Sequence, residues 1–597
     1  MLVIAGPGSG KTLVITHRIL NLIHEKKVNP QNILVITFTK AAALEMQNRF
    51  YALAGKDNPG DFYPVTFGTC HAIFFQIIKL VKDIQAKDIL KEYEKCSMME
   101  EILSDALNVM QSQFTPSMEL AQKILSEISK VKNTGLDYQK WESAYCSQAE
   151  FIFLYESYQK ECTRQGKIDF DDMLLLCLEL LRTKKSLLEK CRSMFTYILV
   201  DEFQDINAVQ YEIIKLLGAK HQNVFVVGDD DQSIYGFRGA SPQIMSKFLA
   251  DFPGAQKVEL VKNYRCKQEI VDTSVRLINH NSNRFLKKFE AIPSNRHSVR
   301  YISSMNRRQQ FERVALCIQE YMKEEGHHYE DVAVLFRTNG HASMLVEQLS
   351  LLGIPFQCRE KLENIYDTSI AKDLIAYIRF ALNRNQAADF FRIMNKPGRY
   401  IKRNAIPVHP FRGDMLLQDI RDKNVLQSVS HMLKQLDFIK RFEPFAAINY
   451  IRKGIGYEQY VIEYARHFHL DVQEQLDILE EISQSAKNFR TLKHWLEFVT
   501  TYEETMEQGY QNQKGIHIKT MHGAKGLEWP VVILPDLNEG NMPYKKAQTP
   551  EQIEEERRIF YVAMTRAREY LFFFYVKKEE ADLIGLPSRF LQECLRL

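Results

Sequence analysis

Short apolar runs alternate with longer stretches of mixed polarity along the chain, and each run predicts a buried strand. The runs are rich in β-branched and aromatic residues, and most end at a glycine or a polar turn. Strands are expected at 2–4, 33–37, 197–200, 224–227, 332–337, 531–534 and 571–575. Helices are expected between them, for example at 12–25 and 554–568. Strands that alternate with helices favour the α/β class with parallel sheets.

Two stretches interrupt this alternation because they are charged, helical in pattern and without strand-like runs. They are 86–165 and 395–509, and each is interpreted as an insertion into an α/β domain. We therefore expect a first α/β domain over 1–85 and 166–258 and a second over 259–394 and 510–597. The duplication concerns domain architecture only, since the chain has no short-period repeat.

Composition narrows the class of protein. With 78 basic and 75 acidic residues in 597, the formal charge is +3, so binding to nucleic acid would depend on local patches. No segment reaches the roughly 20 apolar residues of a membrane span, so no membrane contact is expected. The ten cysteines form no CxxC pair, which argues for reduced thiols in a cytoplasm and against zinc or iron–sulfur.

The chain start is unusual because Met1 leads directly into an apolar strand. If that strand is central, the α-amino charge lies near a core and loses hydration free energy. We therefore expect that residues precede Met1.

A glycine-rich loop follows the first strand and predicts a phosphate site. Its members are Ala5, Gly6, Pro7, Gly8, Ser9, Gly10, Lys11 and Thr12. Glycines let backbone N–H groups close around phosphates, Lys11 can reach the β and γ phosphates, and Thr12 can bind magnesium. The strict pattern has glycine where Ala5 stands, and a chance glycine-rich turn is the alternative.

Carboxylates follow two of the other predicted strands. Asp201 and Glu202 follow the strand at 197–200; Asp201 can hold Mg²⁺, and Glu202 can orient and deprotonate an attacking water. An ordinary solvated acidic turn is the alternative. The turn at 229–232 follows the next strand, where ligands of α/β sheets bind, and it ends in Gln232.

Aromatic and basic residues beside these turns suit nucleic acid. Tyr235, Phe237 and Arg238 interleave two rings with a cation, as stacked bases and backbone phosphates require. Phe38 and Thr39 lie at another strand end, where the alternative is that Thr39 caps a helix.

Four further features have bland alternatives. His71 in isolation is more often a structural histidine, the acidic stretch 168–174 suits helix capping, and the glycines at 454 and 456 suit a helix break. The stretch 554–568 suits a solvated helix with Glu/Arg pairs at helical spacing, although near its end the apolar face would bring Arg566 inward.

Seven motifs taken together resemble those of a known family. They are AGPGSGKT, TFTKAAALEM, VDEFQD, VVGDDDQSIYGFRGA, NYRC, TMHGAKGLEW and VAMTRA. Their order and spacing are similar to those of the superfamily 1A DNA helicases of the UvrD/Rep/PcrA group, over almost the whole chain. The resemblance implies two RecA-like P-loop motor domains, 1A and 2A, each interrupted by a mainly helical insertion, 1B or 2B.

The resemblance also implies roles for individual residues. Lys11 and Thr12 would bind ATP and Mg²⁺, Asp201 the metal, and Glu202 would be the catalytic base. Gln232 would sense the γ-phosphate, Tyr264 would stack on adenine, Arg265 and Arg566 would reach the transition state, and Glu528 would contact the nucleotide. The residues that would line the single-strand track are Phe38, Thr39, His71, Tyr235, Phe237, Arg238 and His522.

The implied function is an ATP-dependent helicase or translocase on single-stranded DNA and on single-strand/duplex junctions. By resemblance it moves 3′→5′, serves DNA repair or replication, and works as a monomer or weak dimer.

The chain departs from the family pattern at its start, because the glutamine motif that reads adenine lies upstream of the phosphate loop. The alternative function is accordingly a DNA-binding protein with weak or no ATPase activity. Phe237 stands where the family often has tryptophan, and Lys40 and Ala41 replace the commoner Asn-Lys pair.

Overall fold

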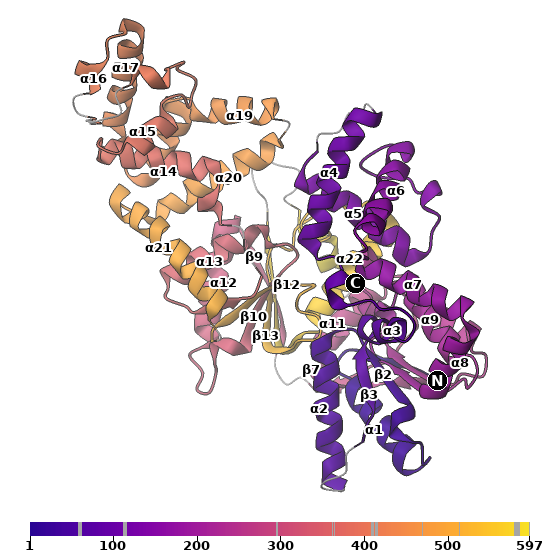
Figure 1. Cartoon of the computed structure of the whole chain (residues 1–597). Helices are drawn as coiled ribbons and strands as arrows, with labels where there is room; N and C mark the ends of the chain where they lie inside the picture. The colour runs from indigo at the N-terminus through magenta and orange to yellow at the C-terminus, as the bar shows by residue number, and fades with distance from the viewer. Residues whose placement is uncertain are drawn as a thin grey trace. The chain divides into compact units, whose positions relative to one another are not determined.

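The computed structural model describes residues 1–57, 63–110, 116–293, 297–360, 364–406, 416–468, 470–512, 514–577 and 586–595, together with Leu362, Phe411 and Gly413. The chain forms two compact units. The first comprises residues 1–306 and 521–597, and the second comprises residues 307–520. Parallel strands with flanking helices occur in both (Figure 1).

A parallel sheet forms the centre of the first unit. In the described residues its strands follow the order β3 (Thr66–Thr69), β2 (Ile33–Thr37), β4 (Tyr197–Val200), β5 (Val224–Gly228), β1 (Leu2–Ala5) and β6 (Lys257–Leu260). Val3 pairs with Val227 on one side and Val258 on the other, so β1 is internal. The chain segments that leave β1, β2, β4 and β5 therefore meet at one edge, where ligands of such sheets bind.

Alternating side chains of these strands fill two separate cores, as the period of a strand requires. Leu2 and Ile4 belong to a core with α3 (Cys70–Lys79), α7 (Phe170–Thr183), α8 (Lys185–Met194), α9 (Ala208–Gly218) and α10 (Ile244–Asp251). Val3 and Ala5 belong to a core with α1 (Lys11–His24) and α2 (Lys40–Asp57). Helices on both faces explain why β1, β2 and β5 are buried along their whole length.

The α-amino group of Met1 lies beside this sheet, as expected from the sequence. It donates a hydrogen bond to the Val224 carbonyl at 2.7 Å. Burial lowers its pKa to about 6, with a further contribution from the Arg18 charge. The expected loss of hydration at this position is therefore confirmed.

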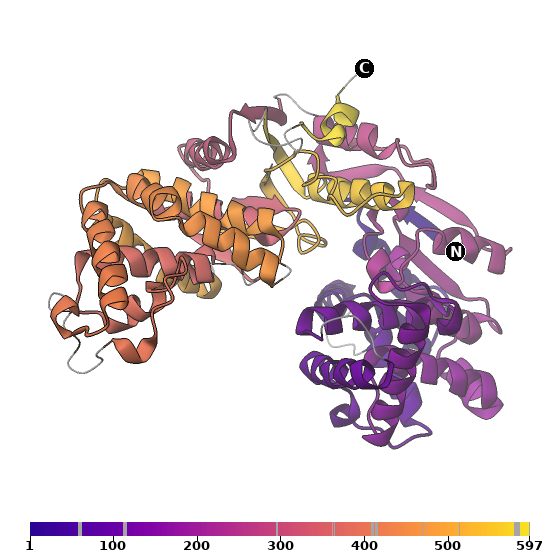
Figure 2. The same cartoon turned by 90° about the horizontal axis from the view of Figure 1, so that it is seen from above.

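In the described residues of the stretch predicted to be helical, three α-helices share a core of their own. They are α4 (Glu92–Met110), α5 (Met118–Thr134) and α6 (Gln148–Arg164), and they lie side by side in both views (Figure 1, Figure 2). A bridge between Ile89 and Ile168 joins the two ends of this stretch.

A buried ion cluster fastens α5 to α7. The Lys132 ammonium lies 2.8 Å from Asp169 and 2.7 Å from Asp172, and its side chain has no exposed surface. Asp169 also caps α7, accepting from the Asp172 N–H at 2.7 Å. The predicted capping role of the acidic stretch is confirmed, and the structure adds a tertiary ion pair to it.

The remainder of the first unit is a second group of strands and helices. Its elements are β7 (Lys262–Lys267), α11 (Gln268–Ile278), β8 (Glu290–Ile292), β9 (Val299–Ser304), β13 (Trp529–Leu534), α22 (Pro550–Met564), β14 (Ala567–Val576) and α23 (Arg589–Cys594). β14 pairs in parallel with both β13 and β9.

The expected helix over 554–568 is wrong at its carboxyl end. α22 ends at Met564, and the apolar and aromatic run of β14 begins at Ala567. Thr565 is the C-cap residue of the helix, with ψ of 5°, and its hydroxyl donates to the Val562 carbonyl. Arg566 thus lies in the turn between a helix and a strand.

The second unit contains three parallel strands and a mainly helical remainder among its described residues. The strands follow the order β11 (Phe356–Cys358), β12 (Ile516–Thr520) and β10 (Val332–Phe336). Its helices are α12 (Arg307–Tyr321), α13 (Ala342–Leu351), α14 (Ser369–Leu382), α15 (Ala387–Ile393), α16 (Leu416–Asp419), α17 (Lys423–Ile439), α18 (Pro444–Asn449), α19 (Tyr457–His467), α20 (Val472–Ser485) and α21 (Leu492–Gln511).

The glycines of the KGIGY stretch break a helix, as predicted. Gly454 ends a π-helical turn, Tyr450–Gly454, and Gly456 has φ of 86° at the start of α19. That left-handed conformation favours glycine because it has no Cβ.

The α/β class is confirmed. No disulfide joins the cysteines of the described residues. None of the helices in the described segments combines the length and the apolar character that crossing a bilayer demands.

Replacing Lys132 with methionine should destabilise the first unit. The change leaves Asp169 and Asp172 buried without their cation, and breaking such a pair costs about 3–5 kcal/mol. Denaturant unfolding of Lys132→Met should therefore show a markedly lower midpoint. Lys130→Met is the control: it lies two residues earlier in α5, is exposed, and loses only a cation–π contact with Trp141, so it should unfold close to the parent chain. Equal midpoints for all three proteins would contradict the role of Lys132.

Candidate functional site

The glycine-rich loop connects β1 to α1 in a conformation that depends on its glycines. Gly8 and Gly10 have φ of 68° and 86°, which side chains strongly disfavour. The Ser9 hydroxyl donates to the Gly6 carbonyl at 2.7 Å and closes the loop. No side chain caps the start of α1, so its first N–H groups are available to an anion.

The other side of this loop is covered by β7. Asn263 donates from its amide to the Pro7 carbonyl at 2.8 Å, and the Tyr264 N–H donates to the Gly8 carbonyl at 2.9 Å. A Cβ atom at Gly8 would lie 2.5 Å from the Cβ of Arg265, so this close approach also requires glycine. The backbone of Tyr264 thus lies beside the loop, and its side chain is 68% exposed, which suits stacking on a base.

Lys11, Asp201 and Glu202 meet at the edge of the sheet. The Lys11 ammonium lies 3.6 Å from Glu202 Oε1, and it is buried with no hydrogen-bond partner in the described part of the chain. Burial alone would raise the pKa of Glu202, but the charges of Lys11, Lys525 and Arg566 and a hydrogen bond from Gln204 lower it to about 2. Glu202 is therefore a carboxylate at neutral pH.

Asp201 has the opposite electrostatic environment. Burial and repulsion by Glu202 raise its pKa to about 7, and the charge of Lys11 offsets this only in part. The Asp201 carboxylate accepts from the Glu202 N–H at 2.9 Å. A buried carboxylate that lacks enough positive charge fits the donor set of a hard divalent cation, so the residues present fit a magnesium ion.

Gln204 and Asp229 connect this carboxylate pair to Gln232. Gln204 donates to Glu202 Oε2 and accepts from the Asp229 N–H at 2.9 Å. Asp229 in turn accepts from Gln232 Nε2 at 2.7 Å. Because these groups are buried, the hydrogen bonds hold the turns after β4 and β5 in one arrangement.

Two arginines, Arg265 and Arg566, belong to the second group of strands and helices in this unit. Arg265 lies beside Gly8 of the loop, and Arg566 lies beside Gln232. Arg566 is 2% exposed and donates to the carbonyls of Val562 and Leu527 and to Gln232 Oε1 at 3.4 Å. None of these partners is a carboxylate, and burial, together with the Arg265 charge, lowers the pKa of Arg566 to about 9. A buried cation with neutral partners suits an anionic ligand.

Arg265 differs from Arg566 because it already has an acidic partner. It forms an ion pair with Glu528, which Arg568 also contacts, and it donates to the Thr565 carbonyl at 3.3 Å. In this structure Glu528 and Arg265 are therefore paired with each other.

Lys525 contacts both Gln232, on the phosphate side of the site, and Tyr235, on its aromatic side. Its ammonium lies 2.6 Å from Asp205 and donates to the Gln232 carbonyl at 2.6 Å. It also lies 5.0 Å from the centre of the Tyr235 ring, in a cation–π contact. One buried charge thus touches both Gln232 and an aromatic residue of the predicted DNA track.

Four aromatic side chains form a continuous cluster next to Lys525. Phe38 stacks on Tyr235 with ring centres 4.8 Å apart and an interplanar angle of 18°. Phe237 lies edge-on to Tyr235 at 5.9 Å and to His522 at 6.0 Å. Phe237 is 52% exposed, so its ring offers a face to a ligand.

The other predicted track residues differ in their surroundings. Thr39 is exposed and accepts from the Ala42 N–H at 3.1 Å, so it caps α2 as the alternative interpretation expected. His71 lies edge-on to Phe170 at 5.7 Å, and Phe170 is 52% exposed. The Arg238 side chain lies outside the described residues.

The comparisons with known proteins agree with this geometry. Residues 1–253 match the UvrD/REP helicase N-terminal domain, and residues 258–578 match the UvrD-like helicase C-terminal domain. The chain belongs to the UvrD/REP helicase family. Among its relatives is the ATP-dependent DNA helicase PcrA of Staphylococcus aureus, 32% identical over 99% of this chain and 84% of the relative. The enzyme of the same name from Staphylococcus epidermidis is 31% identical over the same shares.

Membership of the UvrD/REP helicase family confirms the resemblance and the two RecA-like motor domains. The structure brings together the loop from Ala5 to Thr12 with Asp201, Glu202, Gln232, Arg265 and Arg566, and it gathers Phe38, Tyr235, Phe237 and His522 nearby. It leaves His71 with Phe170. The domain bounds and the roles of these residues stay predictions.

Three side chains in the site were not singled out from the sequence. Gln204 and Lys525 lie within motifs, but only their tertiary contacts give them a purpose. Phe170 was assigned to a capping stretch, although an exposed aromatic between two aspartates is unusual for a helix start that needs only a cap.

Phe237→Ala should weaken the binding of single-stranded DNA. Stacking on one base contributes about 1–3 kcal/mol, so affinity for an oligothymidine should fall about fivefold to a hundredfold. Phe438→Ala, which removes a comparably exposed ring from α17, is the control and should bind as the parent chain does. Fluorescence anisotropy at one salt concentration measures both, and unchanged affinity of Phe237→Ala would refute the stacking role.

Proposed function

We propose that this chain is an ATP-dependent DNA helicase that translocates on single-stranded DNA and couples ATP hydrolysis to unwinding. The observation that carries the proposal is Lys525, because its ammonium contacts both Gln232 beside the phosphate loop and Tyr235 in the aromatic cluster. The relatives are named ATP-dependent DNA helicases, which supports the same activity here.

In the proposed mechanism the loop amides, the start of α1 and Lys11 bind the triphosphate of ATP. Glu202 orients a water molecule and takes one of its protons as the water oxygen bonds to the γ-phosphorus. The bond from that phosphorus to the bridging oxygen breaks, and its electron pair leaves with ADP. Arg566 donates hydrogen bonds to the charge that develops on the γ-phosphoryl oxygens.

Thr12 and Asp201 would hold the magnesium ion, which would neutralise phosphate charge. Tyr264 would stack on the adenine ring, and Glu528 would exchange its arginine partner for the nucleotide. Arg265, once separated from Glu528, would add a second guanidinium near the γ-phosphate.

ATP hydrolysis would be coupled to DNA binding through Lys525, because its ammonium contacts both Gln232 and Tyr235. Loss of the γ-phosphate changes the contacts of Gln232, and a shift of the Gln232 carbonyl moves the Lys525 ammonium that it binds. The ammonium leaves or approaches the Tyr235 ring, which alters how firmly Tyr235 and Phe237 hold a base. Phe170 and His71 would extend the same track.

The alternative, a DNA-binding protein with little ATPase activity, is less well supported. A chain that no longer hydrolyses ATP has no need of a buried Lys11, a Glu202 held as carboxylate and a buried Arg566 with neutral partners. These features cost stability and are explained together by nucleotide hydrolysis.

Lys11→Ala should abolish DNA-stimulated ATP hydrolysis because it removes the cation that reaches the phosphates. The control is Lys26→Ala, at an exposed position just after the same helix, which should retain the parent rate. A steady-state assay with and without single-stranded DNA measures both. Hydrolysis that survives in Lys11→Ala at the parent rate would refute the assigned site.

Movement is proposed to run 3′→5′, with junctions of single and double strands as substrates and a role in repair or replication. Strand displacement should therefore proceed from duplexes with a 3′ single-stranded tail and not from those with a 5′ tail. An ATP-dependent gel assay with the two substrates measures the direction. Displacement only from the 5′ tail would reverse this assignment, while the hydrolysis assay above tests the motor separately.

A further inference from the structure

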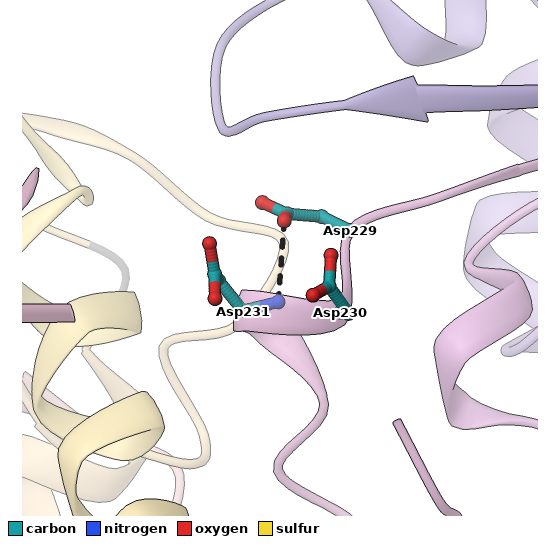
Figure 3. A group of neighbouring side chains, drawn as sticks. All are labelled: Asp229, Asp230 and Asp231. Atoms are coloured by element: carbon teal, nitrogen blue, oxygen red, sulfur yellow. Dashed lines mark hydrogen bonds between the residues drawn. The ribbon is translucent and has the colours of Figure 1, made fainter. Parts of the chain in front are cut away.

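Three consecutive aspartates lie buried in the turn that follows β5. Asp229, Asp230 and Asp231 point their carboxylates toward one another (Figure 3), within 4.8 Å. Such a group resembles a metal site, but two cations of this chain already occupy it. They are Arg284 and Lys287, from the segment between α11 and β8, and both side chains are almost fully buried.

The two cations are not equivalent. Arg284 donates twice to Asp231, at 2.9 and 2.7 Å, and once to Asn279. Lys287 contacts all three carboxylates, at 2.7 Å for Asp230 and 2.6 Å for Asp231, and it also binds Asp229 Oδ1. Lys287 is therefore the direct cationic partner of Asp229.

Asp229 determines how the Gln232 amide is turned. Its carboxylate can only accept hydrogen bonds, so the group that Gln232 directs toward it at 2.7 Å must be the NH₂. The Gln232 oxygen then lies on the other side, where it accepts from Arg566. Because guanidinium groups only donate, both neighbours require the same orientation of the amide.

We propose that Lys287 is a positioning residue: by holding Asp229 as a carboxylate, it makes Gln232 present its carbonyl oxygen to the attacking water. This inference rests on the proposed ATP hydrolysis. In that reaction one O–H of the water donates to Gln232 Oε1, while Glu202 accepts the other proton as the phosphorus–oxygen bond forms. Gln232 thus acts on the nucleophile and does not donate to the γ-phosphate.

The charges around Asp229 make its ionisation depend on Lys287. Burial alone would raise the pKa of Asp229, and the charges of Lys287 and Lys11 lower it below its usual value. The other groups that face it are Asp230 and Asp231 in its own turn, Arg284 beside Lys287, and Tyr561 in α22. Without Lys287, the buried carboxyl takes a proton, and its new O–H can donate to Gln232, which turns the amide over.

Lys287→Met tests the inference in the full chain. At pH 7 the kcat of DNA-stimulated ATP hydrolysis should fall about tenfold or more, with KM for ATP within about threefold of the parent value. The kcat of the variant should rise with pH, because the active form of Asp229 is the carboxylate and its pKa is raised without Lys287. The parent chain should not show this added rise, since its Asp229 is already ionised.

Arg284→Met is the matched control, because it removes an equally buried cation from the same cluster without touching Asp229. It should lower the melting temperature as Lys287→Met does, yet keep kcat within about twofold of the parent value. Equal losses of kcat in the two variants, or a pH profile of Lys287→Met parallel to that of the parent, would overturn the positioning role.

A second variant covers the case in which Lys287→Met does not fold. Asp229→Asn keeps the shape of the side chain but permits either orientation of Gln232, so kcat should fall without a new dependence on pH. An unchanged kcat in Asp229→Asn would also overturn the inference. Absence of hydrolysis in the parent chain would refute the proposed function, whereas hydrolysis that Lys287→Met and Asp229→Asn leave intact refutes only this inference.

Discussion

The Lys525 ammonium holds together the parts of the first unit that carry its chemistry. It is bound at 2.6 Å by both Asp205 and the Gln232 carbonyl, and it lies over the Tyr235 ring. These partners follow different strands of the sheet, and Lys525 comes from a segment more than 250 residues later in the chain. Removing this one charge would leave Asp205 buried without a cation and would separate the phosphate side from the aromatic side.

Buried charge explains much of the surrounding arrangement. The carboxylates at the edge of the sheet need cations, and the chain supplies Lys525 for Asp205 and Lys287 for Asp229. Lys11 and Arg566 are the reverse case among the described residues: the Lys11 ammonium has Glu202 only at 3.6 Å and no hydrogen-bond partner, and the hydrogen-bond partners of Arg566 are neutral. An anion that enters between them would satisfy both, which is a physical reason for a phosphate to bind there.

The same reasoning separates the acidic groups that could bind a metal from those that do not. The carboxylate oxygens of Asp229, Asp230 and Asp231 lie within 4.8 Å of one another, as in a metal site. Lys287 and Arg284, however, already supply the positive charge that an ion would bring. Among the described residues no cation forms an ion pair with Asp201, and burial and repulsion by Glu202 raise its pKa although Lys11 offsets part of that rise. An unbalanced buried negative charge is therefore a better indication of a metal site than the proximity of carboxylates alone.

Local chemistry allowed the sequence to predict the α/β class, the glycine-rich loop, the carboxylates after the strands and the aromatic residues beside them. Each of these depends on short-range rules. Apolar runs form strands, left-handed turns need glycine, and charged residues occur where a buried strand ends. The end of α22 was misplaced because a single turn at Thr565 decides where helix becomes strand.

Only the tertiary structure decided which of these residues meet. The partners of Lys287, Lys525 and Gln204 lie between two and more than 300 residues away, and no spacing rule connects them. The orientation of the Gln232 amide likewise depends on Asp229 and Arg566, which the chain brings together from separate elements. Residue types set what each side chain can donate or accept, whereas burial and distance in the folded chain select the contact that it makes.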